Sequence, residues 1–323
     1  MLFLREEDVS KLISFKEAIE AIERIHLEQA LGKAKNLPRR RIYGEGYVLH
    51  TMSASAESLG IAGLKTYLST PTRTVFVVLL YSISKSELIA VIEADILGRI
   101  RTGAASAAAS KYLARKNSSV IGIVGSGRQA FTQALALSEI FTPDNIIVYS
   151  REKTNAEKMC SELIRRGLKC FVQDTLRAVF EKSDIISTAT NSREPFVSKD
   201  LIKEGVHLNL VGSNNPQRSE AYPEIFEKVD LVATDDKEQA KIESGDLIRA
   251  VESEYLTWDN VYELWQVVSK SISRENDDQV TLFKSHGIAL WDIAVAYLAY
   301  EKAARLGIGS EIDFKGFWQY RYF

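Results

Sequence analysis

The sequence predicts an α/β protein in which a Rossmann-type, doubly wound parallel sheet is inserted into a second, α+β domain for substrate binding and dimerisation. Three observations predict this fold. They are a glycine-rich turn between an apolar strand and a helix, a series of strand–helix units after it, and short β-branched runs before it. We expect residues 1–114 and 286–323 to form the substrate-binding and dimerisation domain, and residues 115–285 to form the dinucleotide-binding domain.

The composition indicates a protein of two domains that acts on a small molecule. The chain has 323 residues, of which 46% are hydrophobic and 26% charged, and it is longer than one compact domain usually needs. A net charge of −2 gives no overall attraction for nucleic acid or for an anionic membrane. No apolar run approaches the roughly 20 residues of a membrane span, and the N-terminal segment becomes charged too early for a secretory signal. We therefore expect a cytoplasmic protein.

The N-terminal third of the chain predicts a helix, a sheet and a second helix. Ser14 and Glu17 have the spacing of a capping box, and apolar residues then recur at helical spacing to about Gly32. Residues 47–94 contain short β-branched and aromatic runs with Gly, Ser and Pro between them, which predicts a mainly antiparallel sheet. The alanine-rich residues 99–115 predict a helix that packs closely on its neighbours.

Beyond this point strands and helices alternate. The strand candidates are VIGIVG, NIIVYS, DIISTAT, HLNLVG and VDLVAT. Helical stretches separate them, which is typical of a doubly wound parallel sheet. Residues 286–306 predict a long apolar-faced helix that ends at a glycine, and we expect this helix to return to the first domain.

The cysteines and histidines carry no pattern of a disulfide framework or a metal site. Cys160 and Cys170 are the only cysteines and form no C-x-x-C pair, so we expect two free thiols. The four histidines are scattered without the spacing that places two ligands on one helical face. We expect no bound metal.

The glycine-rich turn predicts a dinucleotide site. In VIGIVGSGRQA, Gly125, Gly127 and Ala130 fit the pattern G-x-G-x-x-G/A, and Arg128 and Gln129 lie within the same turn. Glycine at the first two positions permits a tight turn and a close approach of the backbone to a pyrophosphate, which lies at the helix N-terminus. The alternative is a glycine turn with a purely structural role.

The end of the following strand bears on the choice of cofactor. An NAD site usually presents Asp or Glu there, whereas this chain has Ser150 and Arg151. A guanidinium can donate paired hydrogen bonds to a 2′-phosphate, which favours NADP(H) over NAD(H). Alternatively, Arg151 is a solvated loop residue and Glu152 contacts the ribose of NAD.

Four segments together resemble the superfamily of ornithine cyclodeaminases, mu-crystallin and archaeal alanine dehydrogenases, and the resemblance covers nearly the whole chain. The segments are RTGAAS at 101–106, YLAR at 112–115, GSGRQA at 125–130, and FKSHGIALWDIAVAYLAYEKA ending at Ala303. The resemblance implies an NAD(P)-dependent enzyme that transfers hydride at the α-carbon of a small amino or imino acid. It also implies a homodimer, which the apolar run TVFVVLLYS favours as well.

The resemblance implies a role for each of several cationic residues. Arg101 would bind the substrate carboxylate, to which a planar guanidinium is suited, although by itself it is an ordinary surface arginine. Lys65 would reach the substrate nitrogen or carboxylate, and burial would allow it to exchange a proton at neutral pH. Without the resemblance, Lys65 is a strand-edge lysine. One arginine of residues 39–41 would match a second carboxylate-binding arginine, and we take Arg40 and Arg41 as the candidates.

On the cofactor side, the resemblance implies that Thr102 faces the cofactor and that Ser285 and Gly287 form a backbone turn near the nicotinamide. Asp292 corresponds to the aspartate of the last family motif and is assigned to the same side. His286 replaces a usually apolar residue, either as a packed neutral histidine or as a proton donor near the nicotinamide.

Two departures from the superfamily pattern affect the expected reaction. Asn214 stands where cyclodeaminases carry an aspartate near the substrate, and an amide cannot serve as a general base. Gly98 replaces a threonine before the R-T motif. We therefore expect an alanine dehydrogenase-like or ketimine reductase-like oxidoreductase. The alternatives are an ornithine cyclodeaminase, which forms proline and ammonia, and a mu-crystallin-like NADPH-binding protein with little catalysis.

Overall fold

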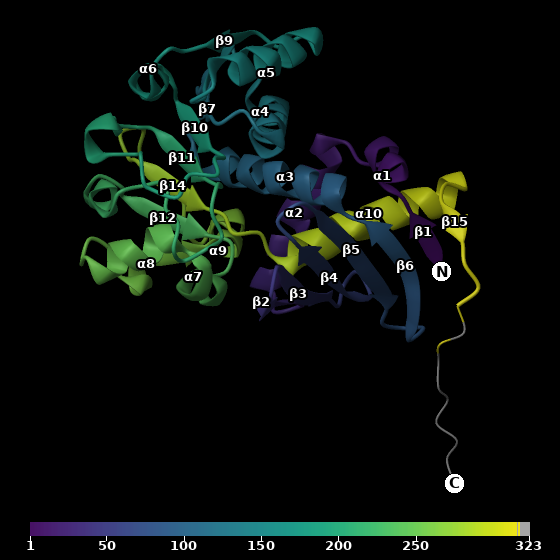
Figure 1. Cartoon of the computed structure of the whole chain (residues 1–323). Helices are drawn as coiled ribbons and strands as arrows, with labels where there is room; N and C mark the ends of the chain where they lie inside the picture. Colours follow the sequence, from purple (N-terminus) through teal and green to yellow (C-terminus); the bar gives the residue numbers. More distant parts are fainter. Residues whose placement is uncertain (315, 317–323) are drawn as a thin grey trace. The chain divides into compact units, whose positions relative to one another are not determined.

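The computed structural model describes residues 1–314 and 316 and divides into two compact units. Unit 1 consists of Met1–Ser14, Leu31–Gly98 and Ile288–Phe323, and unit 2 consists of Phe15–Ala30 and Arg99–Gly287. Of the expected range 286–323, residues 315 and 317–323 lie outside the described part. Figure 1 colours the chain along its sequence, and the colours show that the segments of unit 1 come from both ends of the chain.

The observed division differs from the expected domain boundaries in two helices. Helix α2 (Phe15–Ala30) and most of α3 (Asp95–Leu113) group with unit 2. The reason is close packing within that unit. A Cβ on Gly103 of α3 would lie 2.6 Å from the carbonyl oxygen of Thr132, a residue of α4 (Arg128–Phe141). Helix α2 also contacts α4.

The described part of unit 1 contains a seven-stranded sheet with the order β15-β1-β6-β5-β4-β3-β2. The strands are β1 (Leu2–Leu4), β2 (Ala34–Gly44), β3 (Tyr47–Ala56), β4 (Ile61–Ser69), β5 (Thr74–Ser82), β6 (Glu87–Glu93) and β15 (Ser310–Glu311). Only β1 and β6 pair in parallel within it, so the prediction of a mainly antiparallel sheet is confirmed. The sequence did not predict β2, which contains a proline and a bulge between Leu37 and Arg40.

In the described part of unit 1, two helices lie entirely within the unit. They are α1 (Glu6–Leu12) and the predicted C-terminal helix, α10 (Ala289–Leu306). Helix α10 ends at Gly307, whose φ of 66° is readily adopted by glycine. It packs on β2, β3, β4 and β5. The approach is close, because a Cβ on Gly63 of β4 would lie 2.9 Å from Ile293 Cγ2.

The described part of unit 2 contains an eight-stranded sheet with the order β13-β12-β14-β11-β10-β7-β8-β9. The strands are β7 (Val120–Val124), β8 (Asn145–Tyr149), β9 (Cys170–Val172), β10 (Ile185–Thr188), β11 (His207–Leu210), β12 (Leu231–Thr234), β13 (Val261–Glu263) and β14 (Thr281–Lys284). Every pairing is parallel. The five predicted strands are all present, as β7, β8, β10, β11 and β12. The chain order reverses at β7, the place where doubly wound sheets bind ligands at the carboxyl ends of their strands.

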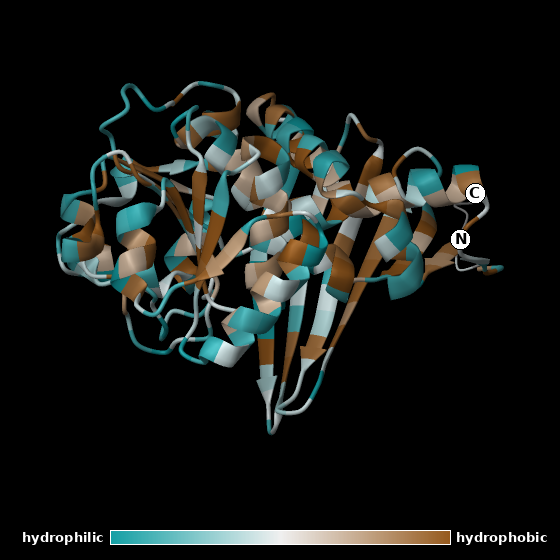
Figure 2. Ribbon diagram, turned by 90° about the horizontal axis from the view of Figure 1, so that it is seen from above, coloured by the Kyte–Doolittle hydropathy of each residue, from teal (hydrophilic) through white to brown (hydrophobic). Residues whose placement is uncertain are grey.

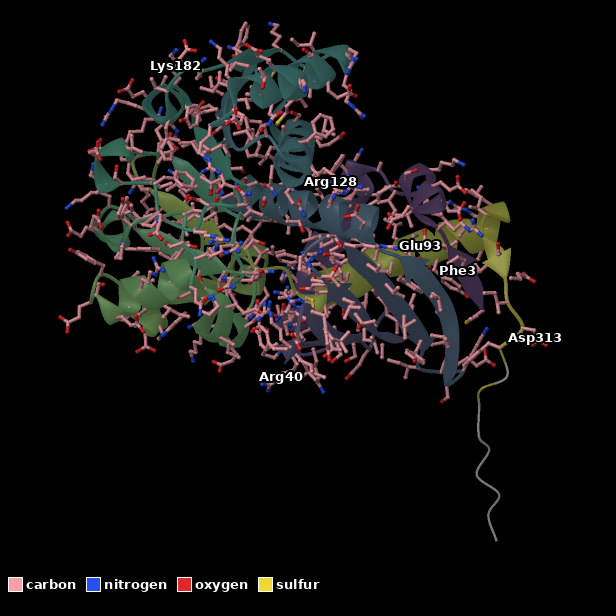
Figure 3. All side chains as sticks on the ribbon, in the orientation of Figure 1. Phe3, Arg40, Glu93, Arg128, Lys182 and Asp313 are labelled. Carbon is pink, nitrogen blue, oxygen red and sulfur yellow. A yellow bond between two sulfur atoms is a disulfide. The ribbon has the colours of Figure 1, made fainter. Side chains whose placement is uncertain are left out.

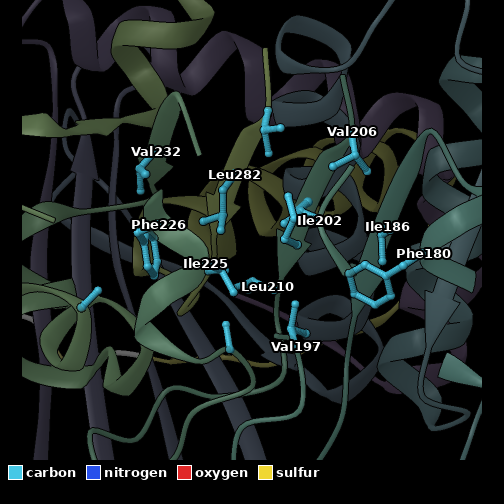
Figure 4. Close-up of a cluster of buried hydrophobic side chains, with 14 of the residues drawn as sticks. Phe180, Ile186, Val197, Ile202, Val206, Leu210, Ile225, Phe226, Val232 and Leu282 are labelled. Atoms are coloured by element: carbon cyan, nitrogen blue, oxygen red, sulfur yellow. The ribbon is translucent and has the colours of Figure 1, made fainter. Parts of the chain in front are cut away.

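Helices cover this parallel sheet, and apolar side chains fill the space between. The remaining helices of unit 2 are α5 (Lys153–Arg165), α6 (Leu176–Lys182), α7 (Lys237–Glu243), α8 (Gly245–Glu252), α9 (Leu264–Val268) and the short 3₁₀ turns η1 (Lys199–Leu201), η2 (Pro223–Glu227) and η3 (Trp258–Asn260). Phe180, Ile186, Leu210 and Leu282 lie in one buried cluster (Figure 4). Figure 2 shows the hydrophobic residues concentrated along the strands. This burial fixes the strand ends that carry the candidate site.

The expectation of two free thiols was wrong. Cys160 on α5 and Cys170 on β9 form a disulfide with a Cα–Cα separation of 5.2 Å, within the usual range for such bonds. The helix ends at a turn where Gly167 has a φ of 84°, and the chain then runs back along the helix into β9. The two cysteines meet because of this reversal, which their spacing in the sequence does not reveal.

None of the helices in the described ranges combines the length and apolarity that a bilayer-spanning helix requires. The expected cytoplasmic location stays a prediction.

Candidate active site

Most of the residues that the sequence assigned to the cofactor line one cavity in unit 2. The cavity has a volume of about 760 Å³ and lies at the carboxyl ends of β7, β8, β10 and β11. Its lining includes Gly125, Gly127, Arg128, Gln129, Ser150 and Arg151. Ala130 lies buried in the first turn of α4, directly behind this lining. A cavity of this size at the switch point of a doubly wound sheet suits a dinucleotide.

The two glycines of the turn serve different purposes. Gly125 has a φ of 116°, and a Cβ there would lie 2.6 Å from the carbonyl oxygen of Ala189, so the fold itself requires glycine. Gly127 has a φ of −80°, and no heavy atom beyond its chain neighbours lies within 4 Å of its Cβ position among the described residues. The space in front of Gly127 and the N-terminus of α4 is therefore open. Backbone N–H groups at such a helix end favour a phosphate.

The cavity lining also contains both candidate contacts to the adenosine ribose. Ser150 Oγ lies 2.8 Å from Ser126 Oγ, which joins the end of β8 to the glycine turn. Arg151 and Glu152 are both exposed and both line the cavity. Arg128, at the start of α4, is labelled in Figure 3 and is also exposed. The cavity thus offers two guanidinium groups and one carboxylate to a nucleotide.

A buried carboxylate that the sequence reasoning missed lies behind this cavity. Glu220 accepts hydrogen bonds from Thr188 Oγ1 at 2.6 Å, Thr190 N at 3.0 Å, Thr190 Oγ1 at 2.6 Å and Gly212 N at 2.8 Å. Thr190 and Gly212 line the cavity. Glu220 therefore fixes the carboxyl ends of β10 and β11.

A buried ion pair influences the pKa of Glu220. Burial raises the pKa of Glu220, and the Lys284 ammonium is the strongest opposing influence. Lys284 Nζ lies 2.9 Å from Asp246 Oδ2, and both side chains are fully buried. No spacing in the sequence signals this group, because its members come from the loop after β11, from α8 and from β14.

Arg101 lies against the turn at Gly287 in unit 2. It is buried, and a Cβ on Gly287 would lie 2.3 Å from its Nη1 atom. Gly287 has a φ of 79°, so both the backbone and the guanidinium require glycine. Asp235 holds the turn, since its Oδ2 accepts hydrogen bonds from the backbone N–H of His286 and of Gly287 at 2.6 Å each. The guanidinium of Arg101 therefore packs against a turn whose backbone is held by Asp235.

His286 is packed against Asp235 in unit 2, and the choice between its two alternatives stays a prediction. Its side chain is fully buried, and Nδ1 lies 2.9 Å from Asp235 Oδ1. Burial by itself would raise the pKa of Asp235, but the interactions with His286 and the backbone N–H groups outweigh it and lower the pKa to about 2. Thr102 and Ser285 are also buried in unit 2, outside the lining of the large cavity.

Unit 1 contains a buried ammonium group. Lys65 Nζ donates a hydrogen bond to Asp292 Oδ1 at 2.9 Å, and the two side chains are 4% and 0% exposed. The ring of Phe76 lies 5.2 Å from the same nitrogen. Lys65 is thus enclosed and is not a strand-edge lysine that reaches water. Asp292, which we expected on the cofactor, pairs with Lys65, and its role toward the cofactor stays a prediction.

The three arginines of β2 lie on different faces of the sheet. Arg41 pairs with His50, and Met52 pairs with Lys65, so Arg41 shares the face of Lys65. Arg39 is buried and lies 3.2 Å, from Nε, from Met52 Sδ. Arg40 is exposed and pairs with Thr51, on the opposite face (Figure 3). The structure therefore favours Arg39 and Arg41, whereas we took Arg40 and Arg41 as the candidates. Side chains alternate along a strand, so residues 39 and 41 share one face and residue 40 points to the other.

His50 extends this face as a neutral aromatic group. Its ring stacks on Tyr67 with a centroid distance of 4.0 Å. Burial, followed by the charges of Arg41 and Arg39, lowers the pKa of His50 to about 4. Asn214 belongs to unit 2, in the exposed segment after β11, and is not among the residues that line the large cavity.

Comparison with known proteins finds relatives over almost the whole chain. The profile of the ornithine cyclodeaminase/mu-crystallin family matches residues 1–306. Alanine dehydrogenase of Archaeoglobus fulgidus is 36% identical over 97% of this chain and 98% of its own. The structure of Thermococcus litoralis Delta(1)-pyrroline-2-carboxylate reductase with NADH and L-proline has a TM-score of 0.92 at 36% identity, over 97% of this chain and 100% of that one. An archaeal alanine dehydrogenase dimer with bound NAD has a TM-score of 0.91 at 35% identity, over 98% and 99% of the two chains.

Proposed function

This chain belongs to the ornithine cyclodeaminase/mu-crystallin family, and we propose that it is an NAD(P)-dependent oxidoreductase acting on a small amino or imino acid. The hydride is transferred at the nitrogen-bearing α-carbon. The observation that carries the proposal is the enclosed ion pair of Lys65 and Asp292, in a chain that also has a dinucleotide-sized cavity. A buried ammonium group is costly unless it is paired, as Lys65 is with Asp292, and we infer that this paired group exchanges a proton with the substrate. The names of the relatives, alanine dehydrogenase and pyrroline-2-carboxylate reductase, agree with this chemistry.

We assign separate residues to cofactor binding, substrate binding and proton exchange. The cofactor, when bound, supplies or accepts the hydride. Gly125, Gly127 and the N-terminus of α4 would hold its diphosphate. Arg101 binds the substrate carboxylate by bidentate pairing and orients the α-carbon. Lys65 exchanges a proton with the substrate nitrogen, and Asp292 keeps its ammonium in place.

The first experiment is to assay the purified protein with NADPH and NADH against pyruvate plus ammonia and against pyrroline-2-carboxylate. We expect oxidation of the reduced cofactor in step with product. Formation of proline and ammonia from ornithine with no net change in cofactor would identify a cyclodeaminase instead, which Asn214 disfavours. Tight cofactor binding without turnover of any of these substrates would identify a binding protein.

We also propose that the protein prefers NADP(H) to NAD(H), because Arg151 and Ser150 are suited to bind a 2′-phosphate. We expect Arg151→Asp to weaken NADPH binding by about 10- to 100-fold and to spare NADH, because a charge-assisted hydrogen bond is replaced by repulsion. Fluorescence titration with both cofactors measures this. Lys158→Asp is the matched control, since it makes the same charge change on exposed α5 outside the cavity lining. An equal loss for both cofactors would show that Arg151 does not read the 2′-phosphate.

We also propose that the protein forms a homodimer. Strand β2 is an edge strand, and its Leu37, Ile42 and Tyr43 side chains are 63%, 61% and 74% exposed. Large apolar side chains on a sheet edge are typical of a covered interface. The archaeal alanine dehydrogenase that this chain resembles was solved as a dimer. Sedimentation velocity at micromolar concentration should give a dimer of 36.2 kDa chains, and a monomer there would contradict the proposal.

A further inference from the structure

The first turn of α3 contains a glycine that the helix itself does not need. Gly98 is the fourth residue of α3 and lies in unit 1. Glycine is one of the least favourable residues inside a helix, because it gives up the most backbone freedom. Its backbone conformation gives no reason for glycine either, since Gly98 is not among the glycines with positive φ. The reason for glycine must therefore lie in the packing around it.

A single side chain occupies the space where a side chain at residue 98 would lie. A Cβ at this position would lie 2.8 Å from Lys65 Nζ, which is closer than real Cβ contacts are found. Apart from the neighbours of Gly98 along its own chain and helix, no other heavy atom of the described residues lies within 4 Å of that point. The ammonium group of Lys65 is thus the sole obstacle to a side chain at residue 98.

The same ammonium group has little freedom to move away. Lys65 Nζ is held by Asp292 Oδ1 at 2.9 Å, and the ring of Phe76 lies 5.2 Å from it. The side chain of Lys65 is 4% exposed, so it has no solvent into which to retreat. Displacement by a new methyl group would have to lengthen the ion pair or push the ammonium toward the aromatic ring.

We propose that Gly98 is a positioning residue for Lys65, and that the missing side chain at residue 98 sets the place of the ammonium group. This inference rests on the proposed function, because it takes Lys65 as the group that exchanges a proton with the substrate. Proton transfer requires the donor and acceptor within hydrogen-bond reach, and a misplacement of about 1 Å can cost about 100-fold in rate. Gly98 thus fixes the distance between the ammonium and the substrate nitrogen.

The first test is Gly98→Ala. We expect kcat to fall by about 10- to 100-fold while the Kd for NADPH stays within about twofold, because neither Gly98 nor Lys65 lines the cofactor cavity. The crystal structure of this variant gives a second measurement, in which Lys65 Nζ should have moved away from the new Cβ. An unchanged kcat, or a nitrogen that keeps its place beside the methyl group, would overturn the proposal.

The second test is a stability cycle that needs no activity. In the Lys65→Ala/Asp292→Ala background, which removes both charges together, Gly98→Ala should raise Tm by about 2 °C through helix propensity alone. In the wild-type background the same change should give no rise. A rise in both backgrounds, or in neither, would show that the ammonium is not the obstacle. If the wild-type protein turns over none of the substrates tested, the proposed function fails, and this cycle still decides whether Gly98 accommodates Lys65.

Discussion

Lys65→Ala should lower kcat by about 10²- to 10⁴-fold and leave the Kd for NADPH within about twofold, since it removes the group that exchanges a proton with the substrate. Lys65 is not among the residues that line the dinucleotide cavity, so we expect cofactor binding to survive the change. The change also leaves Asp292 buried without its ammonium partner. Breaking a buried pair in this way costs about 3–5 kcal/mol of unfolding free energy. The rate constants should therefore be measured well below the lowered Tm.

Lys284→Ala is the matched control, because the chain contains a second buried lysine in an equivalent ion pair. Lys284 Nζ lies 2.9 Å from Asp246 Oδ2, and both side chains are fully buried, as in the Lys65 pair. Its loss should destabilise the protein to a similar extent but act on the cofactor cavity through Glu220, and so raise the Kd for NADPH. If the two variants lost kcat and cofactor affinity in the same proportion, Lys65 would have a structural role only.

Gly125→Ala should abolish measurable cofactor binding and strongly lower the unfolding free energy, whereas Gly127→Ala should weaken binding and lower the unfolding free energy much less. A Cβ on Gly125 would meet the carbonyl oxygen of Ala189 at 2.6 Å on a backbone with a φ of 116°. Gly127 has an ordinary φ of −80° and open space around its Cβ position. The open space is where a pyrophosphate would approach the backbone.

Urea unfolding and fluorescence titration with NADPH separate the two effects. We expect a loss of at least about 2 kcal/mol for Gly125→Ala, since strain at a positive φ and a backbone clash add together. For Gly127→Ala we expect a smaller loss of about 0.5–1 kcal/mol, because Gly127 is the N-cap of α4 and alanine is a poor N-cap residue, with a cofactor Kd raised about 10-fold or more. Normal NADPH binding by Gly127→Ala would show that the diphosphate does not lie at this turn.

The sequence predicted the parallel sheet and its glycine turn because both depend on local patterns. Buried strands appear in the sequence as apolar runs. The turn between β7 and α4 needs glycine at fixed positions, so Gly125 and Gly127 could be recognised from their spacing after such a run. Strand β2 could not be found in this way. It is an edge strand with a proline and a bulge, and its arginines hide the alternation that marks a strand.

By itself, therefore, the sequence determined the fold class and the five strands around the glycine turn. The roles of Lys65 and Arg101 came from the family resemblance and stay predictions. The tertiary structure decided which groups meet. It paired Lys65 with Asp292, 227 residues away, joined Cys160 to Cys170, and turned Arg39 rather than Arg40 toward the face of Lys65. Local patterns record how each segment buries its own surface, whereas these contacts depend on strand register and chain reversal, which only the packed molecule fixes.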